Sequence, residues 1–204
     1  MTTPSAGEIE RAVERAWEHL DAGVAREVAG PLRALLARGV ADPGDRADLH
    51  HLIGLACEEL GDRDGMAAAW LETLRLDRES DDETRGLGTA EFERVVGDAL
   101  DELPAEVLER LRNVPVIAEE RPSAEMVADG TDPRVLGLFH GVPMPDESTL
   151  GPGSVGTIHL FARNIEAVSA DEADLREQIR VTVLHETAHY FGFDEDGLRR
   201  LGLD

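Results

Sequence analysis

Lysine is absent from this sequence of 204 residues, and all 20 basic residues are arginines. Aspartate and glutamate number 43, so the formal net charge at pH 7 is -23. A surface with this excess of carboxylates repels phosphate groups, which excludes nucleic-acid binding through a basic footprint. Docking to anionic lipid is disfavoured for the same reason. We therefore expect neither nucleic-acid nor membrane partners.

Cysteine occurs once, at Cys57, so the chain forms no internal disulfide and has no cysteine-rich zinc site. Aromatic residues make up only 4% of the chain, and a core of Leu, Val and Ala is expected, which suits helices. No apolar run reaches the ~18 residues that a transmembrane helix requires. The N-terminal stretch also lacks the pattern of a signal peptide, namely a basic segment followed by an apolar one. We expect a cytoplasmic protein.

The first 80 residues are expected to form helical hairpins. Apolar residues recur at helical spacing, and the Pro43-Gly44 turn and Gly61 separate the helices. The stretch HLIGLACEELGDRDGMAAAWLETLRLD resembles a tetratricopeptide repeat, with Gly54 and Gly61 at its small positions and Trp70 at its large one. The resemblance implies a tetratricopeptide-like helical module over residues 1–80 that recruits proteins. The alternative is two antiparallel hairpins that serve only as a helical extension.

Residues 79–88 are a charged, glycine-containing linker, and residues 89–204 are expected to form a second domain of mixed structure. Two helices are expected after Thr89 and after Pro104. Short strands are predicted over 114–120, 135–141 and 156–162, with a loop rich in proline and glycine between the last two. The capping-box spacing of Ser169 and Glu172 predicts the start of a long helix. The fold class is therefore α+β.

The long helix ends in LHETAHYFGF, a pattern that suits metal-assisted hydrolysis. His185 and His189 are four residues apart, so their imidazoles project from one helical face toward one ion, and neutral imidazole is a good Zn²⁺ ligand. Glu186 lies about 100° further round the helix, where it can act as general base toward a water that the metal activates. The helix is apolar on nearly all sides and therefore buried, which makes unpaired polar groups costly. The alternative is a pair of hydrogen-bonded core histidines.

A third metal ligand is expected just after the helix. Gly192 lets the chain turn back, and Asp194, Glu195 and Asp196 then carry three carboxylates past the metal. Glu195 has the spacing of the last ligand in a His-Glu-x-x-His-x-x-Gly-x-x-ligand pattern. Acidic residues also favour the start of a helix, so the same residues have a structural explanation. Asp194 and Asp196 therefore stay open as alternatives to Glu195.

Other candidates are weaker. His140 and His159 lie on predicted strands, and a half-buried, hydrogen-bonded histidine is the favoured interpretation of each. Tyr190 projects in a different direction from the two histidines of the helix, which favours core packing. Cys57 lies in an apolar helix as a small hydrophobic residue. Strand 156–162 is expected to flank the cleft and pair with an extended peptide. No oxyanion donor is identified.

Residues 89–204 resemble the minimal zincin-like metallopeptidase family of bacteria. The resemblance rests on the segments AEFERVVGDALDELP, LGLFHGVP, TIHLFARNIE and VTVLHETAHYFGFDEDGLRRLG. It implies a compact domain with a short sheet, a buried active-site helix and one zinc ion on His185 and His189. The family usually has Asp at the position of Glu195, and glutamate can also ligate.

The sequence thus predicts a zinc metallopeptidase of the HExxH type in which Glu186 is the catalytic base and His185, His189 and Glu195 bind Zn²⁺. Its substrate would be a peptide or protein, and the helical module would recruit that substrate or another protein partner. The alternative is a non-catalytic interaction protein with a structural or silent zinc site. The enzyme is favoured because a structural site has no use for Glu186 and usually closes with four protein ligands.

Overall fold

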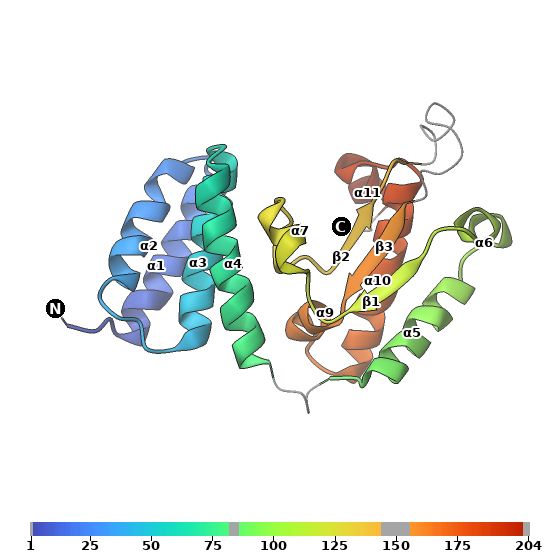
Figure 1. Ribbon diagram of the computed structural model, residues 1–204, viewed down its shortest axis with the longest axis horizontal. Helices are drawn as coiled ribbons and strands as arrows, with labels where there is room; N and C mark the ends of the chain where they lie inside the picture. Colours follow the sequence, from blue (N-terminus) through green and yellow to red (C-terminus); the bar gives the residue numbers. More distant parts are fainter. Residues whose placement is uncertain (1, 82–85, 144–155, 202–204) are drawn as a thin grey trace. The chain divides into compact units, whose positions relative to one another are not determined.

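A computed structural model describes residues 2–81, 86–143 and 156–201, without the side chains of Glu195 and Leu201. The chain divides into two compact units (Figure 1). Met1–Asp82 and Pro122–Arg134 form the first, and Glu83–Arg121 and Val135–Asp204 form the second. The prediction of domains over 1–80 and 89–204 therefore differs from these units at one segment, residues 122–134.

The first unit is built from helices. They are α1 (Ala6–Asp21), the short 3-10 helix η1 (Ala25–Glu27), α2 (Ala29–Leu36), α3 (Pro43–Glu59) and α4 (Arg63–Ser80). Helices α1, α2 and α4 all pack against α3. Aspartates at the helix starts fix α3 and α4: Asp42 accepts from the backbone N–H of Asp45, and Asp62 from that of Gly65, both at 3.0 Å. These two aspartates therefore mark where α3 and α4 begin.

Helices α3 and α4 approach closely at Gly54. A Cβ atom there would lie 2.1 Å from the indole of Trp70, whose side chain is fully buried in the core of this unit. Only glycine leaves room for the indole at this point. The helical hairpin predicted for this stretch is thus present, whereas its assignment to the tetratricopeptide repeats stays a prediction.

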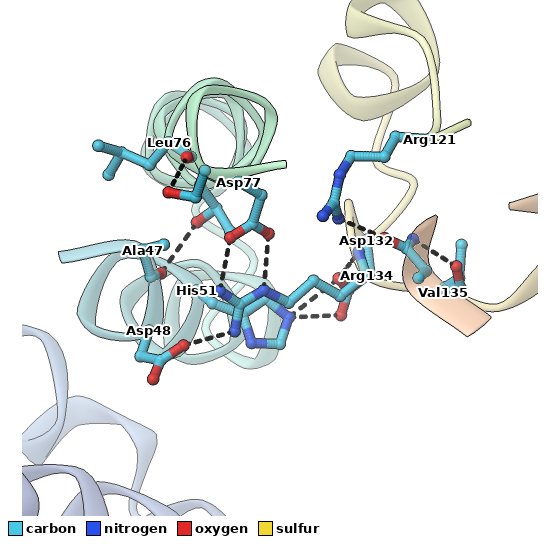
Figure 2. A network of polar contacts seen from close by, with 12 residues as sticks. Ala47, Asp48, His51, Leu76, Asp77, Arg121, Asp132, Arg134 and Val135 are labelled. Atoms are coloured by element: carbon cyan, nitrogen blue, oxygen red, sulfur yellow. Dashed lines mark hydrogen bonds and ion pairs between the residues drawn. The ribbon is translucent and has the colours of Figure 1, made fainter. Parts of the chain in front are cut away.

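Residues 122–134 leave the second unit and pack on the first. They carry the short helix α7 (Ala124–Ala128), in which the fully buried Val127 joins the core of the helical unit. Arg134 forms a two-pronged ion pair with Asp77, with both nitrogen–oxygen distances at 2.9 Å, and lies 2.8 Å from Asp48 (Figure 2). These contacts join segments that are more than 50 residues apart in the sequence.

A second contact of the same segment involves a histidine. Nε2 of His51 lies 2.9 Å from both carboxylate oxygens of Asp132 (Figure 2). One of those oxygens also accepts from the backbone N–H of Arg134 at 2.8 Å. His51 is therefore a packing residue of the helical unit.

The residues on either side of segment 122–134 are both bonded to one buried asparagine of the second unit. The side-chain oxygen of Asn164 accepts from Arg121 at 2.6 Å, and its amide nitrogen donates to the backbone carbonyl of Val135 at 2.6 Å. Asn164 is 3% exposed. Arg121 and Val135 flank residues 122–134, so the side chain of Asn164 holds together the two points at which the chain leaves and re-enters the second unit.

The second unit combines helices with a small mixed sheet, which confirms the α+β fold class. Its helices are α5 (Thr89–Asp101), α6 (Ala105–Leu111), α9 (Ala162–Val168), α10 (Glu172–Tyr190) and α11 (Glu195–Leu201). Its strands are β1 (Val116–Glu119), β2 (Gly137–His140) and β3 (Thr157–Phe161), in the order β1-β3-β2. β3 is parallel to β1 and antiparallel to β2. The three strands predicted from sequence are all present.

Helix α10 supplies much of the core of this unit and packs against α5 and the sheet (Figure 1). Ile179 and Val183 are fully buried beneath Phe92 and Ile158, in agreement with the predicted burial of the helix. The predicted N-cap at Ser169 is wrong by two residues. Asp171 is the cap and accepts from the backbone N–H of Asp174 at 2.9 Å, whereas the side chain of Ser169 donates to Ile165 at the end of α9.

Most of the predicted loop between β2 and β3 lies outside the described residues. Among the helices that the structure describes, none has the length and apolar character to cross a lipid bilayer.

Candidate metal centre

Helix α10 ends at Tyr190, one residue after the second histidine of the motif, and a glycine follows the C-cap residue Phe191. Gly192 has a positive φ of 85°, and its N–H donates to the carbonyl of His189 at 2.9 Å. The N–H of Phe193 donates to the carbonyl of Ala188 at 3.1 Å. This pair of bonds is a Schellman motif, in which the left-handed residue reverses the chain. The reversal brings the backbone of Phe193 back beside the last turn of the helix.

The two histidines of α10 converge. Nε2 of His189 lies 3.0 Å from Nε2 of His185, and the ring planes are inclined by 74°. Nδ1 of His189 lies 3.0 Å from the carbonyl oxygen of Phe193. Because a carbonyl only accepts hydrogen bonds, Nδ1 carries the proton, and Nε2 of neutral His189 presents its lone pair. Metal-binding histidines usually have such a partner on the second nitrogen.

This arrangement fits Zn²⁺. Tetrahedral zinc with Zn–N bonds of about 2.0–2.1 Å places two nitrogen ligands about 3.3 Å apart, close to the 3.0 Å between the two Nε2 atoms. Both imidazoles are half-buried, so an ion there would be partly shielded from water. The same distance suits a hydrogen bond between two core histidines, the alternative raised by the sequence. Measured metal content distinguishes the two.

Glu186 lies between the histidines in sequence and is 5% exposed. Its Oε2 accepts from the backbone N–H of Phe139 in β2 at 2.7 Å. The contact is short because β2 has a glycine at the crossing: a Cβ on Gly137 would lie 2.7 Å from Cγ of Glu186 and 2.8 Å from Cγ2 of Thr182. The missing side chain of Gly137 therefore lets the strand approach the helix and orient the carboxylate. Sequence analysis did not identify Gly137 or Phe139, although both lie in the quoted segment LGLFHGVP.

Two of the three carboxylates after the helix have structural partners. Asp194 caps α11, since its Oδ1 accepts from the N–H of Gly197 at 2.8 Å, and Asp196 pairs with Arg199 at 2.8 Å on the surface. These contacts favour the structural explanation for these two residues. Glu195 is the first residue of α11, but its side chain lies outside the described part of the structure. Within that part, no group of three or more His, Cys, Asp or Glu is arranged to hold a metal.

The other candidate residues have structural partners or are exposed. Nδ1 of His159 lies 2.6 Å from a carboxylate oxygen of Glu119 on the neighbouring strand, as expected of a half-buried, hydrogen-bonded histidine. His140 is exposed. Tyr190 is buried in the core, with its hydroxyl 3.4 Å from the carbonyl of Arg110, which confirms the packing interpretation. Cys57 is buried, and this burial raises the pKa of its thiol.

The expectation that strand 156–162 pairs with a peptide is wrong. β3 lies between β1 and β2 and already pairs with both, so its backbone groups are used within the sheet. β2 is an edge strand, and the N–H of Phe139 points away from β3 toward Glu186. The strand next to the candidate metal centre is therefore β2.

Comparison with known proteins agrees with this site. Residues 111–203 match the family model of the Zincin-like metallopeptidases, and the match runs from β1 to α11. It includes His185, Glu186 and His189, and it leaves helices α1 to α5 outside. No curated protein matches the chain. The part of this chain that carries the two converging histidines is thus similar to the Zincin-like metallopeptidases.

Proposed function

We propose that this protein is a zinc-dependent peptidase whose centre is formed by His185, Glu186 and His189. The observation that carries the proposal is the pair of Nε2 atoms 3.0 Å apart beside a buried carboxylate held by a backbone N–H. The similarity of residues 111–203 to a metallopeptidase family supports the same chemistry. Glu195 is proposed as the third protein ligand on its spacing in the sequence.

Zn²⁺ held by these residues would polarise the scissile carbonyl and make an attacking water more acidic. Glu186 acts as general base: it takes a proton from the attacking water and passes it to the leaving amine. The N–H of Phe139 fixes one oxygen of this carboxylate, so the orientation of the base is set before substrate binds. His189 is oriented in turn by the carbonyl of Phe193.

β2 is proposed as the strand along which a peptide substrate lies. It is an edge strand, and Gly137 and Phe139 stand at the register positions whose backbone groups face away from β3. The N–H of Phe139 is already bonded to Glu186, so an extended peptide would pair with the other backbone groups of this edge, with its scissile bond near Glu186. The helical unit is proposed to recruit protein substrates or partners to this peptidase in the cytoplasm.

Zinc content and hydrolysis of fluorescein-labelled casein by the purified full chain test the proposal. We expect about one zinc per chain, lost in His185→Ala and in His189→Ala because each removes a protein ligand. Glu186→Gln should keep zinc and fold, since the change is nearly isosteric, but lower kcat/KM by roughly 10²–10⁴-fold. Glu177→Gln is the matched control: it makes the same change on the exposed side of α10 and should leave activity unchanged.

The outcomes separate the proposals. Unchanged zinc content in both histidine variants would refute the metal centre and favour hydrogen-bonded core histidines. Zinc that depends on both histidines, without hydrolysis of casein, would favour the alternative of an interaction protein with a silent zinc site. Activity retained by Glu186→Gln would refute the role of Glu186 as the base.

A further inference from the structure

We propose that a groove between α1 and α2 binds an acidic segment of a partner protein. The groove has a volume of about 350 Å³, and all the residues that line it belong to the helical unit, whose helices α1 and α2 are labelled in Figure 1. Arg11, Arg15 and Arg38 contribute its basic side chains, Glu8 its one carboxylate, and Pro31 and Leu35 part of its apolar surface. The proposal does not depend on peptidase activity.

The groove is positively charged in a protein of net charge -23. Glu8 is already used inside it, because its carboxylate pairs with the guanidinium of Arg38, in part through a 3.0 Å hydrogen bond. Arg38 also donates to the backbone carbonyl of Thr2 at 3.3 Å. Arg38 and, to a smaller extent, Arg11 lower the pKa of Glu8, so Arg11 also acts on this carboxylate, although it forms no ion pair with it. Three arginines against one carboxylate leave the groove with a formal excess of two positive charges.

Arg11 and Arg15 differ from other helical arginines of this chain. Arg75, Arg94 and Arg180 each pair with a carboxylate three residues away on their own helix. Arg11 and Arg15 are exposed, and among the residues that the structure describes neither forms an ion pair. They are four residues apart, so both side chains lie on one face of α1. Carboxylates of a ligand would complete the pairing that the chain's own carboxylates do not.

The groove suits a short acidic peptide. Two acidic side chains of a short peptide would place their carboxylates beside Arg11 and Arg15. Their methylene groups would contact the apolar surface at Pro31 and Leu35. Guanidinium groups bind carboxylates through paired hydrogen bonds.

The test measures binding of fluorescein-labelled hexaglutamate to the full chain by fluorescence anisotropy. Binding is expected at about 50 mM NaCl and should weaken as salt screens the charges. The variant Arg11→Gln/Arg15→Gln should weaken it at least about fivefold, since two exposed charge pairs are lost. The matched control Arg26→Gln/Arg63→Gln removes the same charge from exposed positions of the same unit outside the groove, and its affinity should match the unmodified chain. Labelled hexaglutamine should not bind.

Three results would overturn the proposal. They are no binding of hexaglutamate, an equal loss of affinity in the two double variants, and binding of a hexathymidylate oligonucleotide as tight as that of the peptide. Thermal unfolding followed by circular dichroism checks that both variants keep the fold. Because zinc content and casein hydrolysis are not read in this experiment, its failure is distinct from failure of the proposed peptidase.

Discussion

At the scale of single residues, the candidate centre depends on which nitrogen of His189 carries a proton. The carbonyl of Phe193 accepts from Nδ1, so Nε2 faces His185 with its lone pair. A metal would find the two imidazoles already convergent, because folding has ordered them before the metal binds. Loss of the Phe193 contact would free the ring of His189 without removing a ligand.

The third ligand is also decided by single residues, and three neighbouring carboxylates provide a matched set. Glu195→Ala should weaken zinc affinity at least about tenfold, because it removes the proposed third ligand. Asp194→Ala should keep zinc but lose the cap of α11, at a cost of about 1 kcal/mol. Asp196→Ala removes only a surface ion pair with Arg199 and should change neither property.

Competition with a chelator of known affinity measures zinc binding in all three variants. Retention of full affinity by Glu195→Ala, with loss in Asp194→Ala or Asp196→Ala, would reassign the third ligand and leave the two histidines in place.

At the scale of elements, the centre depends on the contact between β2 and α10. Gly137 is the point of closest approach, where a Cβ atom would overlap both Glu186 and Thr182. The carboxylate of Glu186 then accepts from the N–H of Phe139, two residues further along the same strand. Asn164 holds the carbonyl of Val135, two residues before Gly137, so the start of β2 is fixed as well.

Gly137→Ala is expected to separate β2 from α10. The new methyl group should destabilise the fold by about 1–3 kcal/mol, as overpacking of a core does. It should also lower kcat more than zinc content, because it displaces Glu186 and leaves the histidines in place. Gly97→Ala is the control: Gly97 lies within α5 with open space at its Cβ position, so alanine there should be neutral or stabilise by up to about 1 kcal/mol.

Urea unfolding, zinc content and casein hydrolysis of the two variants are the measurements. Equal stability and activity of Gly137→Ala and Gly97→Ala would show that the close approach of β2 to α10 is not required.

At the scale of the whole molecule, each of the two units is built from two separate stretches of the chain, which the linear sequence does not indicate. The chain leaves the second unit at residue 122 and returns at residue 135, with the segment between them packed on α3 and α4. Val127 is buried by those helices, and Arg134 is neutralised by Asp77 and Asp48. Helices α3 and α4 therefore cover a segment that belongs in sequence to the peptidase-like region.

Deletion of residues 1–82 tests this arrangement. The core around Phe92, Ile158 and Ile179 is independent of that region, so residues 83–204 should unfold cooperatively and keep zinc. Residues 122–134, however, lose the apolar contacts of Val127 and the carboxylates around Arg134. Trypsin should therefore cleave after Arg134 several times faster than in the full chain, because local unfolding exposes the site.

Asp77→Ala in the full chain is the milder comparison: it removes the two-pronged ion pair and should speed the same cleavage to a smaller degree. Equal cleavage rates in the full and truncated chains would mean that the helices do not hold the segment. Loss of cooperative unfolding would mean that the two units share one core.

The sequence by itself determined the local features of this protein. Spacing of apolar residues predicted the helices and strands, and a separation of four residues placed His185 and His189 on one helical face, because helical geometry is set by near neighbours. Capping was less certain, since Ser169 and Asp171 both suit an N-cap and only the structure shows Asp171 in use. The zinc chemistry and the assignment of Glu186 as base stay predictions from that same motif.

Only the tertiary structure decided which strand lies at the edge, why Gly137 is required and where residues 122–134 pack. Strand order places β3 in the centre, although β2 and β3 read alike as short apolar runs. The packing of residues 122–134 depends on the ion pair of Arg134 with Asp77 and on the burial of Val127 in a core built from residues far earlier in the chain. These contacts join positions that are tens of residues apart, so no local pattern records them, and they form only when the two segments meet in the folded chain.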